Sequence, residues 1–115
     1  MTARKPKTIQ HFAKNYPQTA LCLRLDVTKK DTIYATVNAA IEKFGNIDVL
    51  INNAGYCLRG AVEECTEEEI YAEFNTNFFG AVRMIQAVLP HMRKAGTIIN
   101  YSSIAALDTS AGSAF

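Results

Sequence analysis

The sequence predicts an α/β protein with a doubly wound parallel sheet. Helical and strand-like patterns alternate along its 115 residues, and each connection between strands is long enough for a helix. The strand expected over 47–51 is apolar apart from Asp48, as is typical of a parallel strand covered on both faces. A hydrophobic content of 49% and a charged content of 20% fit one globular unit rather than a disordered chain.

The first half of the chain predicts a helix over 6–16, a short strand over 20–25 and a second helix that ends at Gly45. Thr28 and Asp31 have the spacing of a capping box, in which two side chains satisfy free N–H groups at a helix start. The second helix should bury one residue per turn: Ile33, Val37, Ile41 and Phe44.

The second half predicts a strand over 47–51, one long helix after Thr66, kinked near Pro90, and a strand over 97–101. Thr66 and Glu69 form a second capping box. The buried stripe expected for the long helix repeats at three- and four-residue steps: Ile70, Phe74, Asn77, Ala81, Ile85, Val88 and Met92. Crossovers of helical length place all strands in parallel.

Composition and charge argue against several classes of protein. The net charge is +1, so neither nucleic acid nor a membrane surface is expected as partner, and the basic residues within 1–30 are interpreted mainly as a solvated helix face. No apolar run approaches the roughly 20 residues that span a bilayer, and no signal segment follows the basic start. Three cysteines without a C-x-x-C pair favour a reducing, cytoplasmic setting, and the two distant histidines predict no metal site.

Polar or small residues follow each predicted strand. These ends are Asp26-Val27, Asn52-Asn53-Ala54-Gly55 and Tyr101-Ser102-Ser103. Ligands of doubly wound sheets bind beyond the carboxyl ends of the strands, so we expect one ligand site there. The Asn-Asn-Ala-Gly run has a simpler alternative as a strand-to-loop turn, because Asn and Gly are common turn residues.

Three single positions carry further information. A buried amide without partners costs on the order of 1–3 kcal/mol, so Asn77 should contact a backbone carbonyl or a water, unless it lies on the helix surface. Gly80 costs about 1 kcal/mol relative to Ala in a helix, which predicts close packing against another element. Ser103 has neither a base nearby nor a G-x-S-x-G pattern, which favours a hydrogen-bond donor over a nucleophile or a turn serine.

Taken together, four segments resemble the short-chain dehydrogenase/reductase family in order and spacing: Leu25–Thr28, Asn52–Gly55, Asn77–Gly80 and Ile98–Ser103. The resemblance spans about Thr2 to Phe115. It implies a three-layer αβα fold of Rossmann type and an oxidoreductase that acts on an alcohol or carbonyl group. Residues 74–107 look most like members that act on steroids, retinoids and other lipophilic carbonyl compounds.

The resemblance also implies roles at the cofactor. Asp26 would hydrogen-bond the adenine ring, beside the backbone of Val27, and Asn53, Ala54 and Gly55 would line the adenosine ribose and stabilise the central sheet. In family members that select NAD, an acidic residue follows the second strand.

At the matching place this chain has no acid, and Arg4 follows, which would favour a 2′-phosphate. NADP(H) is therefore expected, with NAD(H) as the alternative. On the substrate side, Ser103 would polarise the substrate oxygen and Asn77 would hold a water in a proton relay.

The chain departs from the family pattern in two places. The glycine-rich T-G-x-x-x-G-x-G turn and the catalytic Y-x-x-x-K do not occur in it. We therefore expect 1–115 to be a partial domain, truncated at both ends, that lacks the central first strand of the sheet and is inactive alone. The parent enzyme would be a homo-oligomer acting on a small-molecule carbonyl or alcohol. The alternatives are a truncated, non-catalytic interaction module of the same fold and a doubly wound domain of unrelated binding function.

Overall fold

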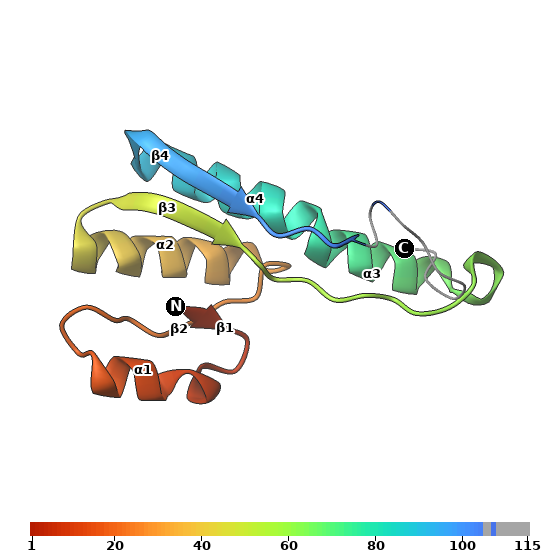
Figure 1. The fold of residues 1–115 in the computed structure, drawn as a ribbon, viewed down its shortest axis with the longest axis horizontal. Coiled ribbons are helices and arrows are strands. Elements are labelled where there is room, and N and C mark those ends of the chain that lie inside the picture. The colour runs from red at the N-terminus through yellow and green to blue at the C-terminus, as the bar shows by residue number, and fades with distance from the viewer. Residues whose placement is uncertain (105–106, 108–115) are drawn as a thin grey trace.

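Strands and helices alternate in the computed structural model, which describes residues 1–104 and 107, the side chains of 93 and 94 apart. The elements are β1 (Thr2–Ala3), α1 (Gln10–Asn15), β2 (Leu23–Arg24), α2 (Lys30–Phe44), β3 (Ile47–Asn52), α3 (Glu67–Asn77), α4 (Phe79–Val88) and β4 (Met92–Asn100). Short 3-10 helices cover Pro6–Thr8, Val62–Glu64 and Leu89–His91. Helices α1 and α2 lie on opposite sides of β1 and β2, which confirms the predicted α/β architecture (Figure 1).

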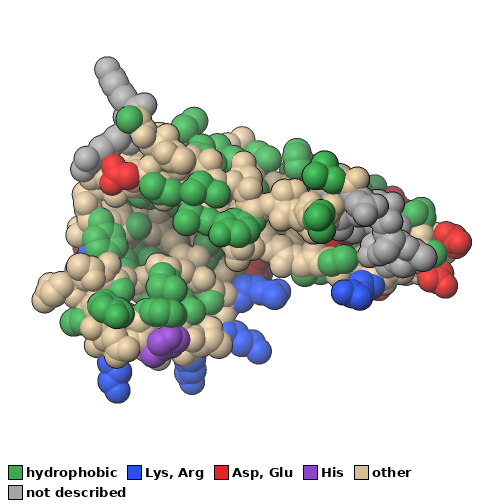
Figure 2. All heavy atoms as spheres, in the orientation of Figure 1, with side chains coloured by type: hydrophobic (Ala, Val, Ile, Leu, Met, Phe, Trp, Pro, Cys, Tyr) green, Lys and Arg blue, Asp and Glu red, His purple; other side chains and the backbone are tan. Residues whose placement is uncertain are grey.

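The strands form two separate parallel pairs, β1 with β2 and β3 with β4. No described strand lies between β1 and β3, as the family order predicts for a chain without its first strand. A cavity of about 450 Å³ occupies this place and is called the inter-sheet slot below. It is lined by β1, β3 and the inner faces of α2 and α4, and Figure 2 shows hydrophobic side chains on both sides of a hollow there.

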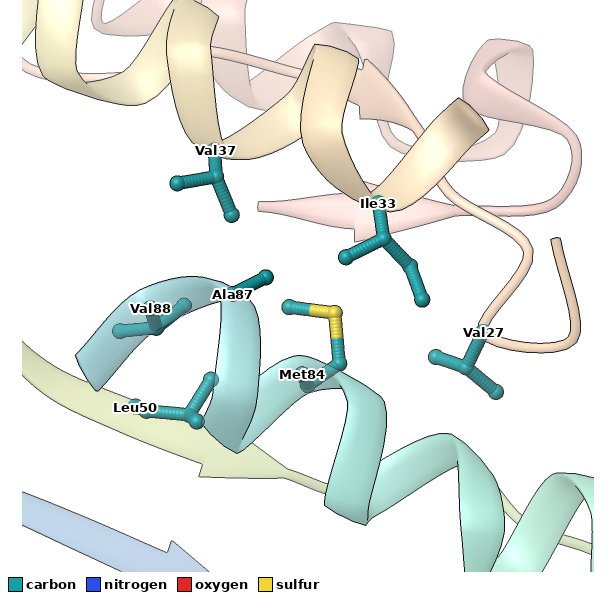
Figure 3. Close-up of a cluster of buried hydrophobic side chains, with 7 residues drawn as sticks. All are labelled: Val27, Ile33, Val37, Leu50, Met84, Ala87 and Val88. Carbon is teal, nitrogen blue, oxygen red and sulfur yellow. The ribbon is translucent and has the colours of Figure 1, made fainter. Parts of the chain in front are cut away.

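The hydrophobic core lies where α2 and α4 face β3. Its members point toward one another in Figure 3: Val27, Ile33, Val37, Leu50, Met84, Ala87 and Val88. Ile33 and Val37 confirm the first half of the predicted stripe on α2, and Ile41 packs against the core while half-buried. The prediction was wrong for Phe44, which is 45% exposed, because it is the last residue of α2 and its ring lies beside Lys43 at the helix end.

Only one of the two predicted capping boxes forms. Thr66 accepts from the Glu69 N–H at 3.3 Å, and the Glu69 carboxylate accepts from the Thr66 N–H at 2.9 Å. The Thr28–Asp31 box is absent, because Thr28 donates its N–H and hydroxyl to Asp26 instead. Helix α2 consequently begins at Lys30, with Lys29 rather than Thr28 as its N-cap, one residue later than predicted.

The predicted long helix is interrupted at Phe78, where φ is −102° and ψ is −64°, and so forms α3 and α4. Phe74 is 48% exposed and Asn77 is exposed as well, which contradicts the predicted buried stripe at these two positions. The only buried residue of α3 is Glu73. Helix α3 reaches past the carboxyl ends of β3 and β4, so no described strand covers its apolar residues (Figure 1).

Strand β4 begins at Met92 rather than at 97, and Gly96 lies inside it instead of ending a helix. Met92 pairs with Ile47 and Thr97 pairs with Val49, so the register shifts between these two pairs. Ile47 at the start of β3 thus pairs with Met92, which the sequence pattern had predicted to lie in a helix. Val49 and Ile51 are 50% and 56% exposed, because α2 and α4 cover only one face of β3; the expectation of two covered faces was wrong for this chain.

Candidate functional site

The carboxyl ends of the strands meet at two adjoining cavities. The first, about 370 Å³, is called the Arg4 cavity; it is lined by every residue predicted to bind the cofactor: Arg4, Asp26, Val27, Asn53, Ala54 and Gly55. The second, about 550 Å³, is called the Ser103 cavity and is lined by both residues predicted for catalysis, Asn77 and Ser103. Residues 53–56 line both cavities, so the two cavities adjoin the same segment of chain after β3.

Asp26 is organised by its own loop. Its Oδ1 accepts from the Thr28 hydroxyl at 2.7 Å and from the Thr28 N–H at 3.0 Å. These two hydrogen bonds hold the pKa of the Asp26 carboxyl below its usual value; the positive charges of Lys29 and Arg4 act in the same direction, and partial burial opposes them. The site therefore presents an ionised carboxylate beside the exposed guanidinium of Arg4.

Val27 joins this loop to helix α4 through a close contact. A Cβ on Gly80 would lie 2.6 Å from Val27 Cγ2, so only glycine allows the two elements to approach. This confirms the close packing predicted for Gly80. Arg83, which the sequence reasoning missed, adds a second link: it donates to Val27 O at 3.4 Å and to Asn75 Oδ1 at 2.7 Å. Arg83 lies three residues after Gly80, on the helix face that the glycine already marked.

Asn77 is exposed, but its amide is engaged on both sides. Its Nδ2 donates to Tyr56 O at 2.7 Å and its Oδ1 accepts from the Tyr56 N–H at 3.1 Å. A Cβ on Gly55 would lie 3.1 Å from the same Oδ1, so the glycine permits this approach. Of the open alternatives, the structure shows the contact with backbone. The predicted water of a proton relay stays a prediction.

Glu73, one helical turn before Asn77, was missed. It is 4% exposed, and its Oε1 accepts from Asn77 Nδ2 at 3.2 Å and from the Leu58 N–H at 3.1 Å. An acid four residues before a candidate site amide was the available signal, because positions i and i+4 share a helix face.

Ser103 follows β4 and is exposed at the Ser103 cavity. The pairing of β3 with β4 brings it there: Asn52 Nδ2 donates to Asn100 Oδ1 at 2.8 Å, and the Tyr101 N–H donates to Asn52 O at 2.9 Å. The ends of both strands are thereby fixed side by side just before the serine. A hydroxyl at this place can donate a hydrogen bond to a ligand oxygen in the cavity.

Within the described part of the chain, no group of three or more His, Cys, Asp and Glu residues is arranged to hold a metal ion. The same residues contain no helix with the length and apolar character needed to cross a membrane.

Comparison with known proteins gives one consistent result. The sequence model of the family described as short chain dehydrogenase matches residues 1–115. Relatives include a 3-ketodihydrosphingosine reductase of Bacteroides thetaiotaomicron, 54% identical over 84 residues, and oxidoreductase calM of Penicillium decumbens, 40% identical over 122 aligned positions. The chain aligns over 71% and 99% of its own length with these two, but spans only 31% and 40% of theirs.

Solved structures agree with this result. A short-chain dehydrogenase from Streptomyces avermitilis superposes with a TM-score of 0.87 at 36% identity, covering 96% of this chain and 42% of that one. ElxO with NADP bound superposes with a TM-score of 0.83 at 34% identity, covering 97% and 48%. From its sequence and from the arrangement of its strands, the chain belongs to the short-chain dehydrogenase family.

Proposed function

We propose that residues 1–115 form the adenosine-binding and part of the substrate-binding region of an oxidoreductase that interconverts an alcohol and a carbonyl compound with NADP(H). The observation that carries this proposal is that residues 53–56 line both cavities. A nucleotide lying along that segment would have its adenosine end between Arg4 and Asp26 and its reactive end beside Ser103.

The residues of the Arg4 cavity fit the adenosine half of such a cofactor. Asp26 offers an ionised acceptor, Gly55 lines the cavity without a side chain, and Arg4 is an exposed cation with no acidic residue at the end of β1. A guanidinium binds a 2′-phosphate through charge-assisted hydrogen bonds, which favours NADP(H) over NAD(H). The NADP bound to ElxO, 34% identical to this chain, supports the same preference.

In the Ser103 cavity, the Ser103 hydroxyl would donate to the oxygen of the carbonyl group and stabilise the charge that develops on it. Asn77 would support the proton relay. Both hydrogens of its Nδ2 are already donated, to Tyr56 O and to Glu73 Oε1, and the second lone pair of its Oδ1 would accept from a ligand. The cofactor, when bound, supplies or accepts the hydride. The name of the Bacteroides relative favours a ketone among the substrates.

The proposal assigns activity to a longer protein, because the chain spans under half of the relatives it matches. The chain by itself is proposed to be inactive, since the glycine-rich turn and the Y-x-x-x-K pair of the family do not occur in its sequence. Cys22, Cys57 and Cys65 form no disulfide among the described residues, which fits a reducing compartment such as the cytoplasm. A homo-oligomeric parent is also proposed.

A second candidate function is strand complementation. The inter-sheet slot lies between the unpaired edges of β1 and β3, and such edges are templates for a further strand. A non-catalytic chain of this fold would bind a partner strand there.

Titration of the complete enzyme with NADPH and NADH, followed by nicotinamide fluorescence, tests the nucleotide assignment. Loss of the Arg4–phosphate interaction in Arg4→Ala should weaken NADPH binding by about 10-fold or more, on the scale of 1.5–3 kcal/mol for hydrogen bonds to charged groups, and leave NADH unchanged. Lys7→Ala, an exposed cation outside the cavity, is the matched control. Equal effects of Arg4→Ala on both nucleotides would contradict the assignment.

A further inference from the structure

Glu73 is a buried carboxylate whose position needs an explanation. It is 4% exposed, lines the Ser103 cavity and is the only buried residue of α3. Its Oε1 accepts two hydrogen bonds, whereas Oε2 has no partner among the described residues. Burying a carboxyl group with one unsatisfied oxygen is costly, so its retention here points to a task other than stability.

The geometry shows what Glu73 contacts. Glu73 and Asn77 lie four residues apart on α3, about 6 Å along the helix axis. Their partners Leu58 and Tyr56 lie two residues apart on the segment after β3, which is about 6.7 Å in an extended chain. The two spacings match, so one face of α3 binds the segment at two points, with Asn77 at one and Glu73 at the other.

Glu73 adds a third hydrogen bond that favours the observed orientation of the Asn77 amide. The Tyr56 carbonyl and N–H require the amide nitrogen and oxygen of Asn77 in this order, and Glu73 provides a third contact that requires the same order. Glu73 Oε1 is an acceptor 3.2 Å from Asn77 Nδ2, so a flipped amide would bring two oxygens together. The orientation that remains keeps Oδ1 on the side of Gly55, where the two cavities join.

We propose that Glu73 is a positioning residue for Asn77, holding its amide in the one orientation that serves the substrate cavity. This inference rests on the proposed function, in which Asn77 supports proton transfer at the Ser103 cavity. It adds to that function a residue that acts through Asn77 rather than on the reacting atoms. Glu73 uses a single oxygen, Oε1, which accepts from both the Asn77 amide and the Leu58 N–H.

The test uses the complete enzyme with variants Glu73→Ala, Glu73→Gln and Asn77→Ala, and Glu68→Ala as an exposed acid on the same helix. Glu73→Ala should lower kcat for carbonyl reduction about 10-fold, less than the roughly 100-fold or more that a general acid–base group itself contributes, and leave the KM for NADPH within about 2-fold. Glu73→Gln keeps the acceptor oxygen and should restore most of kcat. Glu73→Ala should add nothing further in the Asn77→Ala background.

Multiplicative losses in the double variant, or a Glu73→Ala kcat equal to that of Glu68→Ala, would overturn the proposal. A second readout does not depend on activity. Nuclear magnetic resonance of the Asn77 side-chain amide and hydrogen exchange of the Leu58 N–H report the two contacts directly. Glu73→Ala should accelerate exchange at both sites about 10-fold, and Glu73→Gln should not.

The two readouts separate the two hypotheses. If the wild-type enzyme reduces no carbonyl compound but the resonances respond as expected, the proposed function fails while the Glu73–Asn77 contact stands. If carbonyl reduction proceeds and Glu73→Ala leaves both the Asn77 resonance and kcat unchanged, the positioning role is wrong and the proposed function stands.

Discussion

The side chain of Asn77 binds the backbone of Tyr56 in both directions, as a residue of a neighbouring strand would. Nδ2 donates to the carbonyl at 2.7 Å and Oδ1 accepts from the N–H at 3.1 Å. Replacing Asn77 by Ala should lower the free energy of unfolding by about 1–2 kcal/mol, because each such hydrogen bond contributes about 0.5–1.5 kcal/mol net. Denaturant titration measures the loss, and Asn38→Ala on the exposed face of α2 is the control. Hydrogen exchange at the Tyr56 N–H should accelerate in the same variant; an unchanged rate would contradict the tether.

The contact between Gly80 and Val27 predicts an unusual response to alanine. In most helices Gly→Ala stabilises by about 1 kcal/mol, but here the new methyl group would meet Val27 Cγ2 at 2.6 Å and Cβ at 3.0 Å. Overpacking of this kind costs about 1–3 kcal/mol, so Gly80→Ala should reduce the thermal midpoint. In a Val27→Ala background the contact with Cγ2 is gone and only the contact with Cβ at 3.0 Å remains, so Gly80→Ala should then cost clearly less. A penalty of the same size in both backgrounds would mean that the strain lies elsewhere.

The low pKa of Asp26 links stability to pH. A carboxyl group whose pKa is lower folded than unfolded takes up its proton more readily in the unfolded state, so its contribution is present above about pH 4 and is lost as pH falls further. Asp26→Asn should flatten the dependence of the free energy of unfolding on pH. Denaturant titrations between about pH 2.5 and 6, a range around the ordinary pKa of an aspartate, measure this dependence. Thr28→Ala removes the hydroxyl donor but keeps the N–H, so it should flatten the profile by less. Identical slopes in all three proteins would refute the role of these hydrogen bonds.

Ser103 provides a direct test of the substrate cavity. If its hydroxyl donates to the developing charge on the substrate oxygen, Ser103→Ala in the complete enzyme should reduce kcat by about 100-fold, the scale for one such donor. Ser103→Thr keeps a hydroxyl at the end of β4 and should retain part of the activity. Steady-state kinetics of carbonyl reduction, with NADPH binding measured in parallel, separates loss of chemistry from loss of cofactor.

Much of the fold could be predicted from the sequence, because the signals are local. The Thr66–Glu69 box, the stop at Gly45 and the inner face of α2 at Ile33 and Val37 each depend on residues within one or two helical turns. The strand-end segments were also found, since parallel strands bring their carboxyl ends to one edge.

The predictions failed where contacts between residues far apart in the sequence determine the structure. The early start of β4 depends on Met92 pairing with Ile47, and the exposure of Phe74 depends on how far α3 extends past the strands. At the site, the roles of Asp26 and Asn77 came from a family resemblance, whereas Glu73 and Arg83 emerge only when helix and loop are seen together. A single sequence gives the periodicity of a helix but not which of its faces meets a loop 15 residues away.

The inter-sheet slot separates two parts of the molecule that we expect to unfold independently of each other. Residues 1–25 share no strand pairing with β3 or β4, and they are joined to the rest through α2 and the Val27–Gly80 contact. Few buried side chains cross that boundary, since the core lies among α2, α4 and β3. Hydrogen bonds of β1 and β2 should therefore open at lower free energy than those between β3 and β4, so that the end of the chain carrying Arg4 exchanges its amides as a unit of its own.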